Sequence, residues 1–245
     1  MILIFGGTSE GRRLSHALAA EGAAVTVSVA TPYGAEAEGA APGITLRTGR
    51  LEAEEMAALA AGAALCVDAT HPYAVQASRN IRAACRAAGV EYLRLLRPGS
   101  ALPPGALTAP DAAGAAALLA GTEGNILLTT GAKELPAFAG LGAGRLYPRI
   151  LPTHEGLDAC AAAGIPAGQV IAMQGPFTRA MNEATIAQYR IEWLVTKDGG
   201  GPGGFEAKAA AAAAAGARLV VIRRPADGGV SYGEALARCR KAAQL

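Results

Sequence analysis

The sequence predicts an α/β protein with two parallel-sheet domains, and three observations support that prediction. Short apolar segments rich in Val, Leu and Ile alternate with Ala-rich segments of helical pattern along the chain. Hydrophobic residues make up 51% of the 245 residues but aromatic residues only 4%, a mixture that suits Ala-rich helices packed on β-branched strands. A segment dense in Pro and Gly, residues 97–110, interrupts the alternation and divides the chain.

The first half of the chain alternates strand and helix from its start. Residues 2–5 (ILIF) predict a buried strand, and residues 10–22 predict an amphipathic helix that ends at Gly22. Further strands are predicted at residues 24–31, 44–49, 64–70 and 91–98, with helices at residues 52–62 and from the fourth strand through Ala88. This repetition favours parallel strands joined by right-handed crossovers.

The second half resumes the alternation after the Pro/Gly-rich segment. Strands are predicted at residues 125–130, 145–151, 169–174, 192–197 and 218–224, and helices after Lys133, Thr153, Phe177, Gly204 and Ser231. We therefore predict a first domain at residues 1–98, a linker at residues 99–110 and a second α/β domain at residues 111–245.

Composition and charge exclude several classes of protein. The formal net charge of +2 is too small to predict nucleic-acid binding. The four cysteines are scattered without a C-x-x-C pair, so we expect single thiols in a reducing compartment and no metal site. No apolar stretch is long enough and poor enough in Gly to span a membrane. The first strand is expected to begin at Ile2, leaving no room for a cleavable signal, and we expect a cytoplasmic protein.

A glycine-rich loop, residues 6–11 (GGTSEG), joins the first strand to the first helix. Gly6 and Gly11 occupy the first and third positions of G-x-G-x-x-G, and Thr8 replaces the middle glycine beside Gly7. Such a loop and the helix N-terminus behind it suit a pyrophosphate, and Thr8 and Ser9 can add hydroxyl groups. The alternative is a tight turn without a ligand. The strand before the loop and the helix after it favour a nucleotide.

The end of the second strand indicates which nucleotide binds. NAD sites commonly carry Asp or Glu there, whereas this chain has residues 29–34 (VATPYG), with Thr31 and no acid. Several arginines are candidates to lie near that corner, and an arginine can pair with a 2′-phosphate in bidentate fashion. They are Arg12, Arg13, Arg47 and Arg50. The sequence therefore favours NADPH over NADH. The alternative is that these arginines are solvated surface charges, and for Arg13 alone that interpretation is sufficient.

Residues 68–74 (DATHPYA) end the fourth strand. The carboxyl ends of strands line the ligand crevice of a doubly wound sheet, so Thr70, His71 and Tyr73 are placed for a nicotinamide or a substrate. A histidine before proline is also a common turn residue, and both interpretations remain open.

Three loops of the second half each follow a predicted strand and open a helix. They lie at residues 129–135 (TTGAKEL), 172–182 (AMQGPFTRAMN) and 196–208 (TKDGGGPGGFEAK). Helix N-termini with cations nearby form anion sites, and several together suit a ligand with several carboxylates. The cations in or near these loops are Lys133, Arg179, Lys197 and Lys208. Ordinary loops with solvated cations are the alternative. The presence of three at one sheet edge favours the anion sites.

Taken together, these motifs resemble the precorrin-6A reductase family of cobalamin biosynthesis. GGTSEGRRL, VATPYG, DATHPYA, YLRLLRP, TTGAK, AMQGPF and TKDGGG follow that family's order and spacing across nearly the whole chain. The most specific pair is GGTSEGR with DATHPYA. The family's lysine loop often has Ser after Asp, where this chain has Gly199.

The resemblance implies NADPH-dependent reduction of a double bond in the precorrin-6A macrocycle to give precorrin-6B. Hydride goes to a ring carbon and a proton to its neighbour. The resemblance also implies two Rossmann-like domains, with NADPH on the first and the polycarboxylate tetrapyrrole in the cleft between them. A cobalt-containing substrate is equally compatible with the sequence.

These expectations assign the candidate site residues. The cofactor is expected to contact Gly6, Gly7, Thr8, Ser9, Glu10, Gly11, Arg12, Thr31, Arg50, Ala69 and Thr70. The substrate is expected to contact Thr130, Gly131, Lys133, Gln174, Gly175, Arg179, Lys197, Asp198, Gly199 and Gly200. The candidate catalytic residues, any of which can supply the proton, are His71, Tyr73, Lys197 and Asp198; the alternative donor is a water molecule or the solvent.

Two other functions remain possible from the sequence. Another NADP-dependent reductase or epimerase would be expected to carry a Tyr-x-x-x-Lys pair, and no tyrosine of the first half has Lys four residues on. A nucleotide-sensing module without catalysis would not need anion-binding loops in the second domain.

Overall fold

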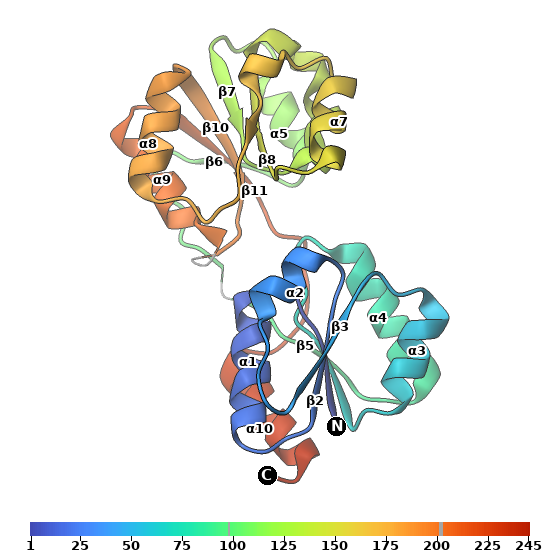
Figure 1. Cartoon of the computed structure of the whole chain (residues 1–245). Helices are drawn as coiled ribbons and strands as arrows, with labels where there is room; N and C mark the ends of the chain where they lie inside the picture. The colour runs from blue at the N-terminus through green and yellow to red at the C-terminus, as the bar shows by residue number, and fades with distance from the viewer. Residues whose placement is uncertain (98, 201–202) are drawn as a thin grey trace. The chain divides into compact units, whose positions relative to one another are not determined.

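A computed structural model describes residues 1–97, 99–200 and 203–245 (Figure 1). Pro98, the predicted last residue of the first domain, lies outside the described residues, as do Gly201 and Pro202 in the predicted loop after residue 197. The chain divides into two compact units. The first unit is Met1–Pro98 with Pro225–Leu245, and the second unit is Gly99–Arg224. Each is built on its own parallel sheet, as the sequence predicted.

The first unit holds five parallel strands in the order β3-β2-β1-β4-β5. Its elements are β1 (Ile2–Phe5), α1 (Ser9–Ala20), β2 (Val25–Val29), α2 (Pro32–Glu38), β3 (Ile44–Thr48), α3 (Ala53–Ala61), β4 (Leu65–Asp68), α4 (Val75–Ala88), β5 (Tyr92–Arg94) and α10 (Tyr232–Ala243). In Figure 1, α1 and α10 cover one face of the sheet, and α3 and α4 cover the other.

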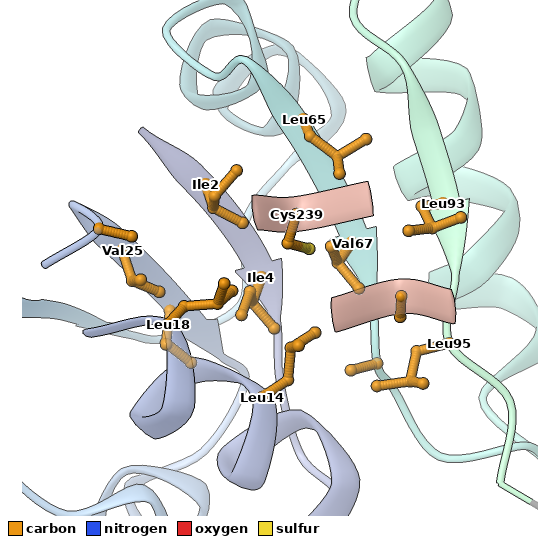
Figure 2. Close-up of a cluster of buried hydrophobic side chains, with 14 of the residues drawn as sticks. Ile2, Ile4, Leu14, Leu18, Val25, Leu65, Val67, Leu93, Leu95 and Cys239 are labelled. Atoms are coloured by element: carbon orange, nitrogen blue, oxygen red, sulfur yellow. The ribbon is translucent and has the colours of Figure 1, made fainter. Parts of the chain in front are cut away.

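The larger core cluster of this unit lies between the sheet and the α1/α10 layer, and a second one lies between the sheet and α3/α4. Figure 2 shows side chains from β1, β4 and β5 meeting Leu14 and Leu18 of α1 and Cys239 of α10. All are buried because the strands are apolar on both faces and the helices present one apolar stripe each.

The last residues of the chain return to the first unit. The sequence prediction assigned residues 225–245 to the second domain, whereas they pack on the first. Val230 pairs with Leu95 beside β5, and α10 then places Ala235 and Cys239 in the core. The periodicity of α10 shows only that one of its faces needs an apolar partner. It does not show that the partner is a helix more than 200 residues earlier.

The second unit holds six parallel strands in the order β6-β11-β10-β7-β8-β9. Its strands are β6 (Leu107–Ala109), β7 (Asn125–Leu128), β8 (Leu146–Ile150), β9 (Ile171–Ala172), β10 (Ile191–Lys197) and β11 (Arg218–Ile222). Its helices are α5 (Ala112–Leu119), α6 (Leu135–Phe138), α7 (His154–Ala162), α8 (Arg179–Gln188) and α9 (Phe205–Ala214). Short 3-10 turns lie at Ala132–Glu134, Ala139–Leu141, Ala143–Arg145 and Ala167–Gln169.

Apart from the 3-10 turns, three elements were not predicted from the sequence: β6, α2 and α5. The segment predicted as a linker, residues 99–110, contains β6, which pairs with β11 at the edge of the second sheet. A strand of three residues in a segment rich in Pro and Gly gives no periodic signal. Helix α2 was also not predicted, since Pro32 and Gly34 resemble turn residues, yet Pro stands in its first turn and Thr31 caps it.

Each sheet has one point at which the chain reverses the direction in which it adds strands. In the first unit this switch point lies between β1 and β4, and in the second between β7 and β10. The loops that leave those strands diverge to opposite faces, which makes the carboxyl ends at a switch point the usual ligand crevice of such sheets.

Candidate functional site

The loop between β1 and α1 uses glycine for two different reasons. A Cβ on Gly6 would lie 3.1 Å from Val27 Cγ1, and one on Gly11 would lie 2.8 Å from Ala69 Cβ, so both glycines allow close packing on the sheet. Gly7 has a φ of +121°, which residues with a side chain rarely adopt, and no other described residue lies within 4 Å of its Cβ position. Gly7 therefore presents open backbone at the sheet edge.

Thr8 links the two loops of the switch point. Its Oγ1 accepts a hydrogen bond from Gly11 N at 3.2 Å, which caps α1, and donates one to Ala69 O at 2.8 Å. A hydroxyl has one hydrogen, so the expected donation from Thr8 to a phosphate is replaced by the bond to Ala69. Thr8 therefore shapes the site through the backbone.

Ser9 and Glu10 are held by Arg97, which sequence reasoning did not single out. Arg97 Nε donates to Glu10 Oε1 at 2.8 Å and Nη2 donates to Oε2 at 2.6 Å, while Nη2 also reaches Ser9 Oγ at 3.0 Å. Burial alone would raise the pKa of Glu10, but the hydrogen bonds and charge of Arg97 hold it below its usual value. The paired arginine thus neutralises an acid in the first turn of α1.

A buried ion pair fixes the backbone after β4. Arg94 Nη1 lies 2.9 Å from Asp68 Oδ1, and Arg94 Nε reaches Asp227 Oδ2 at 2.7 Å. Thr70 N and Oγ1 donate to the Asp68 carboxylate at 3.0 and 2.7 Å. Tyr92 OH also donates to it, and burial together with that charge raises the pKa of Tyr92. The network holds Thr70 at the carboxyl edge of the sheet.

His71 and Tyr73 lie together on the loop that follows. Their ring centroids are 5.6 Å apart, His71 is exposed and Tyr73 is half-buried. The carbonyl of His71 accepts a hydrogen bond from Ala74 N at 2.8 Å, so His71 also belongs to a turn. His71 is therefore a turn residue, and its proposed contact with a nicotinamide or a substrate is compatible with that turn.

The corner beyond β2 and β3 holds the residues predicted to select the cofactor. Thr31 Oγ1 accepts from Gly34 N at 3.0 Å and caps α2. Arg12 Nη1 donates to Ala37 O at 2.9 Å, and Arg50 is exposed just after β3. The guanidinium of Arg13 instead lies 3.4 Å from the centroid of the Tyr232 ring on α10.

The β7/β10 switch point brings together two of the predicted loops of the second unit. Lys197 Nζ, at the end of β10, lies 2.6 Å from Glu134 Oε1 in the loop after β7. Thr130 is buried, and its Oγ1 has no hydrogen-bond partner in the described part of the chain. Gly131 follows with a φ of +91°, and Lys133 is exposed. A buried hydroxyl without a partner at a sheet edge is a natural contact for a ligand.

Asp198 anchors the next loop. Arg224 Nε lies 3.2 Å from Asp198 Oδ2 and donates to Asp198 O at 2.8 Å. Ser100 N donates to Asp198 Oδ1 at 3.1 Å. Gly199 and Gly200 follow and are buried. The Asp198 carboxylate is therefore an acceptor that ties three segments of the second unit together.

The third predicted loop lies between β9 and α8. Gln174 is exposed, and a Cβ on Gly175 would meet the Phe177 ring at 3.0 Å. Arg179 Nε lies 2.6 Å from Glu183 Oε1, and the two side chains are 60% and 36% exposed. Arg179 thus forms a surface ion pair within α8, and its contact with substrate stays a prediction.

The residues that sequence reasoning missed are the partners of the predicted ones. Arg97 and Glu10 are 87 residues apart, and Glu134 and Lys197 are 63 apart. The available signal was Arg94 and Arg97 within the apolar segment YLRLLRP, because a charge in a buried strand implies a buried partner. The identity of that partner depends on tertiary structure.

Across residues 1–97, 99–200 and 203–245, no group of three His, Cys, Asp or Glu side chains is placed to hold a metal ion. Over the same residues no helix combines the length and apolar character needed to cross a membrane.

Comparison with known proteins gives consistent matches over the whole chain. The profile of the family described as precorrin-6x reductase CbiJ/CobK matches residues 1–243. A cobalt-precorrin-6A reductase of Salmonella typhimurium is 37% identical over 230 residues, which cover 91% of this chain and 87% of the relative. A precorrin-6A reductase of Rhodococcus erythropolis is 36% identical over 234 residues, covering 91% and 89%.

A solved structure shares the fold. The chain described as CobK precorrin-6A reductase superposes with a TM-score of 0.78 at 26% sequence identity. The match covers 98% of this chain and 96% of that one.

Proposed function

Because the chain belongs to the precorrin-6x reductase CbiJ/CobK family, an oxidoreductase family that acts on the macrocycle in cobalamin biosynthesis, we propose that it reduces precorrin-6A, with or without bound cobalt, using NADPH held by the first unit. The residues proposed to hold the cofactor are Gly6–Arg12, Thr31, Arg50, Ala69 and Thr70.

One observation carries the placement of NADPH. Gly7 presents open backbone at the β1/β4 switch point, directly before the N-terminus of α1. A pyrophosphate can accept hydrogen bonds from the unpaired N–H groups in the first turn of a helix, and glycines in the loop before it let the phosphates approach the backbone. The Thr8–Ala69 hydrogen bond supports the placement, because it keeps both loops of the switch point together. When bound there, NADPH supplies the hydride.

The local charges support binding of an anion. Glu10 lies in the first turn of α1, where an unpaired carboxylate would repel a phosphate group. The bidentate contact with Arg97 offsets that charge. We propose that Arg97 contributes to cofactor binding through Glu10, as a positioning residue.

The proton for the second ring carbon can come from a side chain with an exchangeable hydrogen, from a water molecule or from the solvent. Lys197 carries such a hydrogen beside Glu134, and Tyr73 and His71 carry others on the loop after β4. Asp198 accepts hydrogen bonds from Arg224 and Ser100, which supports a positioning role for it. We therefore propose Lys197, Tyr73 and His71 as the candidate donors.

We propose that the second unit binds the carboxylates at the periphery of the tetrapyrrole. The loops after β7, β9 and β10 supply N–H groups freed by glycine, the Thr130 hydroxyl without a partner and the exposed Lys133. The proposed contacts are Thr130, Gly131, Lys133, Gln174, Gly175, Arg179, Lys197, Asp198, Gly199 and Gly200.

The Gly7→Ala variant tests the cofactor placement. A Cβ at this position strains the backbone and enters the proposed pyrophosphate contact, so we expect the Kd for NADPH to rise at least about tenfold. Gly22→Ala is the matched control, since Gly22 has a φ of +90° and an equally open Cβ position but lies at the far end of α1. Fluorescence titration measures the Kd for NADPH of both variants. Thermal melting measures how much stability each variant loses through backbone strain.

Equal NADPH affinity in the two variants would overturn the placement at this loop. NADPH oxidation in the presence of precorrin-6A tests the reaction itself, and a protein that binds both ligands without oxidising NADPH would overturn the proposed reductase activity.

A further inference from the structure

Two buried cations in the described part of the second unit have no acidic partner within ion-pair distance. Arg149 in β8 is 7% exposed and Lys208 in α9 is 9% exposed. Within the described residues of this unit, the ion pairs join Arg179, Lys197 and Arg224 to Glu183, Glu134 and Asp198. No carboxylate is left beside Arg149 or Lys208, although buried charges are normally paired.

Neutral groups hold Arg149 in place. Its Nη1 donates to Asn182 Oδ1 at 2.8 Å, and its guanidinium carbon lies 3.9 Å from the centroid of the Phe177 ring. Asn182 is itself fully buried and donates from Nδ2 to Thr178 O at 2.8 Å. A guanidinium has five N–H donors, and only one of them has an acceptor among the described residues. The side chain is oriented but not neutralised.

Arg149 and Lys208 both lie beside α8: Arg149 contacts Phe177 and Asn182 at the start of that helix, and α9, which carries Lys208, packs on it. Burial lowers the pKa of Lys208 to about 8, and the charge of Arg149 contributes to that decrease. The fully buried polar atoms without a partner in the described chain are Ser100 Oγ and Thr130 Oγ1, so the Lys208 ammonium still contacts solvent. An anion can therefore reach it.

The position of this pair points to a ligand. Arg149 is the penultimate residue of β8, Phe177 and Asn182 flank the start of α8, and Lys208 lies in the first turns of α9. These are the carboxyl ends of strands and the N-termini of helices, the edge that the substrate loops also occupy. Two unpaired charges destabilise the free protein here, a cost typical of binding sites.

We propose that Arg149 and Lys208 form a subsite for an oxyanion, a carboxylate at the periphery of the tetrapyrrole. The proposal rests on the proposed function and adds two residues to its binding surface. A guanidinium and an ammonium together can hold both oxygens of one carboxylate. A phosphate of the cofactor has the same chemistry, and the experiment separates the two sources.

Three variants test the subsite. Lys208→Met keeps the length of the stem and removes the charge, Lys208→Arg keeps the charge, and Lys241→Met removes an exposed lysine of α10 as the matched control. We expect Lys208→Met to raise the KM for precorrin-6A about tenfold to a hundredfold, the usual range for a hydrogen bond to a charged group. The Kd for NADPH should stay unchanged. Lys208→Arg should recover most of the loss, and Lys241→Met should match the wild type.

Melting of the free protein adds a readout that separates binding from structural support. Replacing an unpaired buried ammonium by Met should raise the melting temperature, on the order of 2–4 °C. The pKa of Lys208 is lowered to about 8 from 10.5, so the destabilisation is complete below pH 8 and disappears as the pH rises toward 10.5. The gain from Lys208→Met should therefore shrink over that range.

The charged groups around Lys208 come from several elements, and α9 itself carries Glu206. Arg149 is the charge that acts on Lys208. The elements packed against α9 are α8, β10 and β11. The charged residues that these elements carry are Arg179, Glu183, Glu192, Lys197 and Arg218.

Each outcome decides the proposal. A raised KM with normal NADPH binding supports the carboxylate subsite. Weakened NADPH binding with a normal KM would assign the oxyanion to the cofactor and overturn it. Unchanged ligand binding, or equal loss in Lys208→Arg and Lys208→Met, would also overturn it. Equilibrium titration with precorrin-6A in the absence of NADPH tests the subsite even where turnover fails, so failure of the proposed function stays distinguishable.

Discussion

At the scale of single residues, the polar side chains of the site are positioned by partners distant in sequence. Glu10 is held by Arg97, Asp68 by Arg94, and Lys197 by Glu134. Because each pair is at least partly buried, removing one partner leaves a charge in a medium of low dielectric and costs more than the loss of a surface ion pair. Substitutions at the partners should therefore disturb the site as much as substitutions at the predicted residues.

Cofactor preference is a prediction at this scale. Arg12→Ala and Arg50→Ala should each be compared for NADPH and NADH binding, because both arginines lie at the corner where a 2′-phosphate would be held. We expect at least one of them to weaken NADPH about tenfold more than NADH, as for a hydrogen bond to a charged group. Arg13→Ala, which removes a side chain stacked on Tyr232, is the control.

Isothermal titration calorimetry of each arginine variant with NADPH and with NADH measures the affinity lost for each cofactor. If every variant loses equal affinity for NADPH and NADH, the 2′-phosphate contact lies at a different residue.

From the sequence, the loops that follow the strands could be predicted, but the contacts within them could not. Gly7 could be predicted, because a dinucleotide loop requires backbone without a side chain and the flanking strand and helix are visible in the pattern. The hydrogen bond from Thr8 to Ala69 and the clamp of Arg97 on Glu10 could not. Local pattern predicts where a chain turns, whereas a side-chain partner depends on which segments the fold brings together.

At the scale of elements, the apolar pattern predicted most strands and left their partners open. β1 and β10 stand out as apolar runs, while β6 has three residues and depends on β11 for its pairing. α10 was predicted as a helix but was assigned to the wrong domain. An amphipathic stripe shows that a helix is buried on one side and does not show against which sheet.

The packing of α10 can be tested with two alanines of the same helix. Ala235 is fully buried against the first sheet, and Ala237 is exposed. Ala235→Asp places a carboxylate in the core and should lower the free energy of unfolding by about 3 kcal/mol or more, whereas Ala237→Asp should be nearly neutral. Urea unfolding measures the free energy of unfolding of both variants.

Hydrogen exchange locates the effect of Ala235→Asp. The amides of α1, which packs beside α10, should exchange faster, while those of α8 should remain protected. Faster exchange in α8 with no change in α1 would contradict the assignment of α10 to the first unit.

At the scale of the whole molecule, each unit is proposed to bind a different ligand, and Lys197→Ala tests that division. The substitution removes a cation at the β7/β10 switch point and leaves the Glu134 carboxylate, which would repel a substrate carboxylate. We expect the KM for precorrin-6A to rise about tenfold with little change in the Kd for NADPH. Added salt should raise the wild-type KM too, since exposed charges are screened over about 8–10 Å near physiological ionic strength.

Glu134→Gln is the matched variant, because it removes the opposite charge of the same pair and should not raise the KM. A Lys197→Ala protein that loses NADPH affinity but keeps a normal KM for the tetrapyrrole would reverse the proposed roles of the two units.

The return of residues 225–245 to the first unit has a consequence for synthesis on the ribosome. The first unit lacks α10 when it emerges, so the part of its core that Ala235 and Cys239 complete stays uncovered until residues 225–245 are translated. The second unit, made from one continuous segment, is complete earlier and can fold first. The first unit therefore begins to be translated before the second unit but is completed after it.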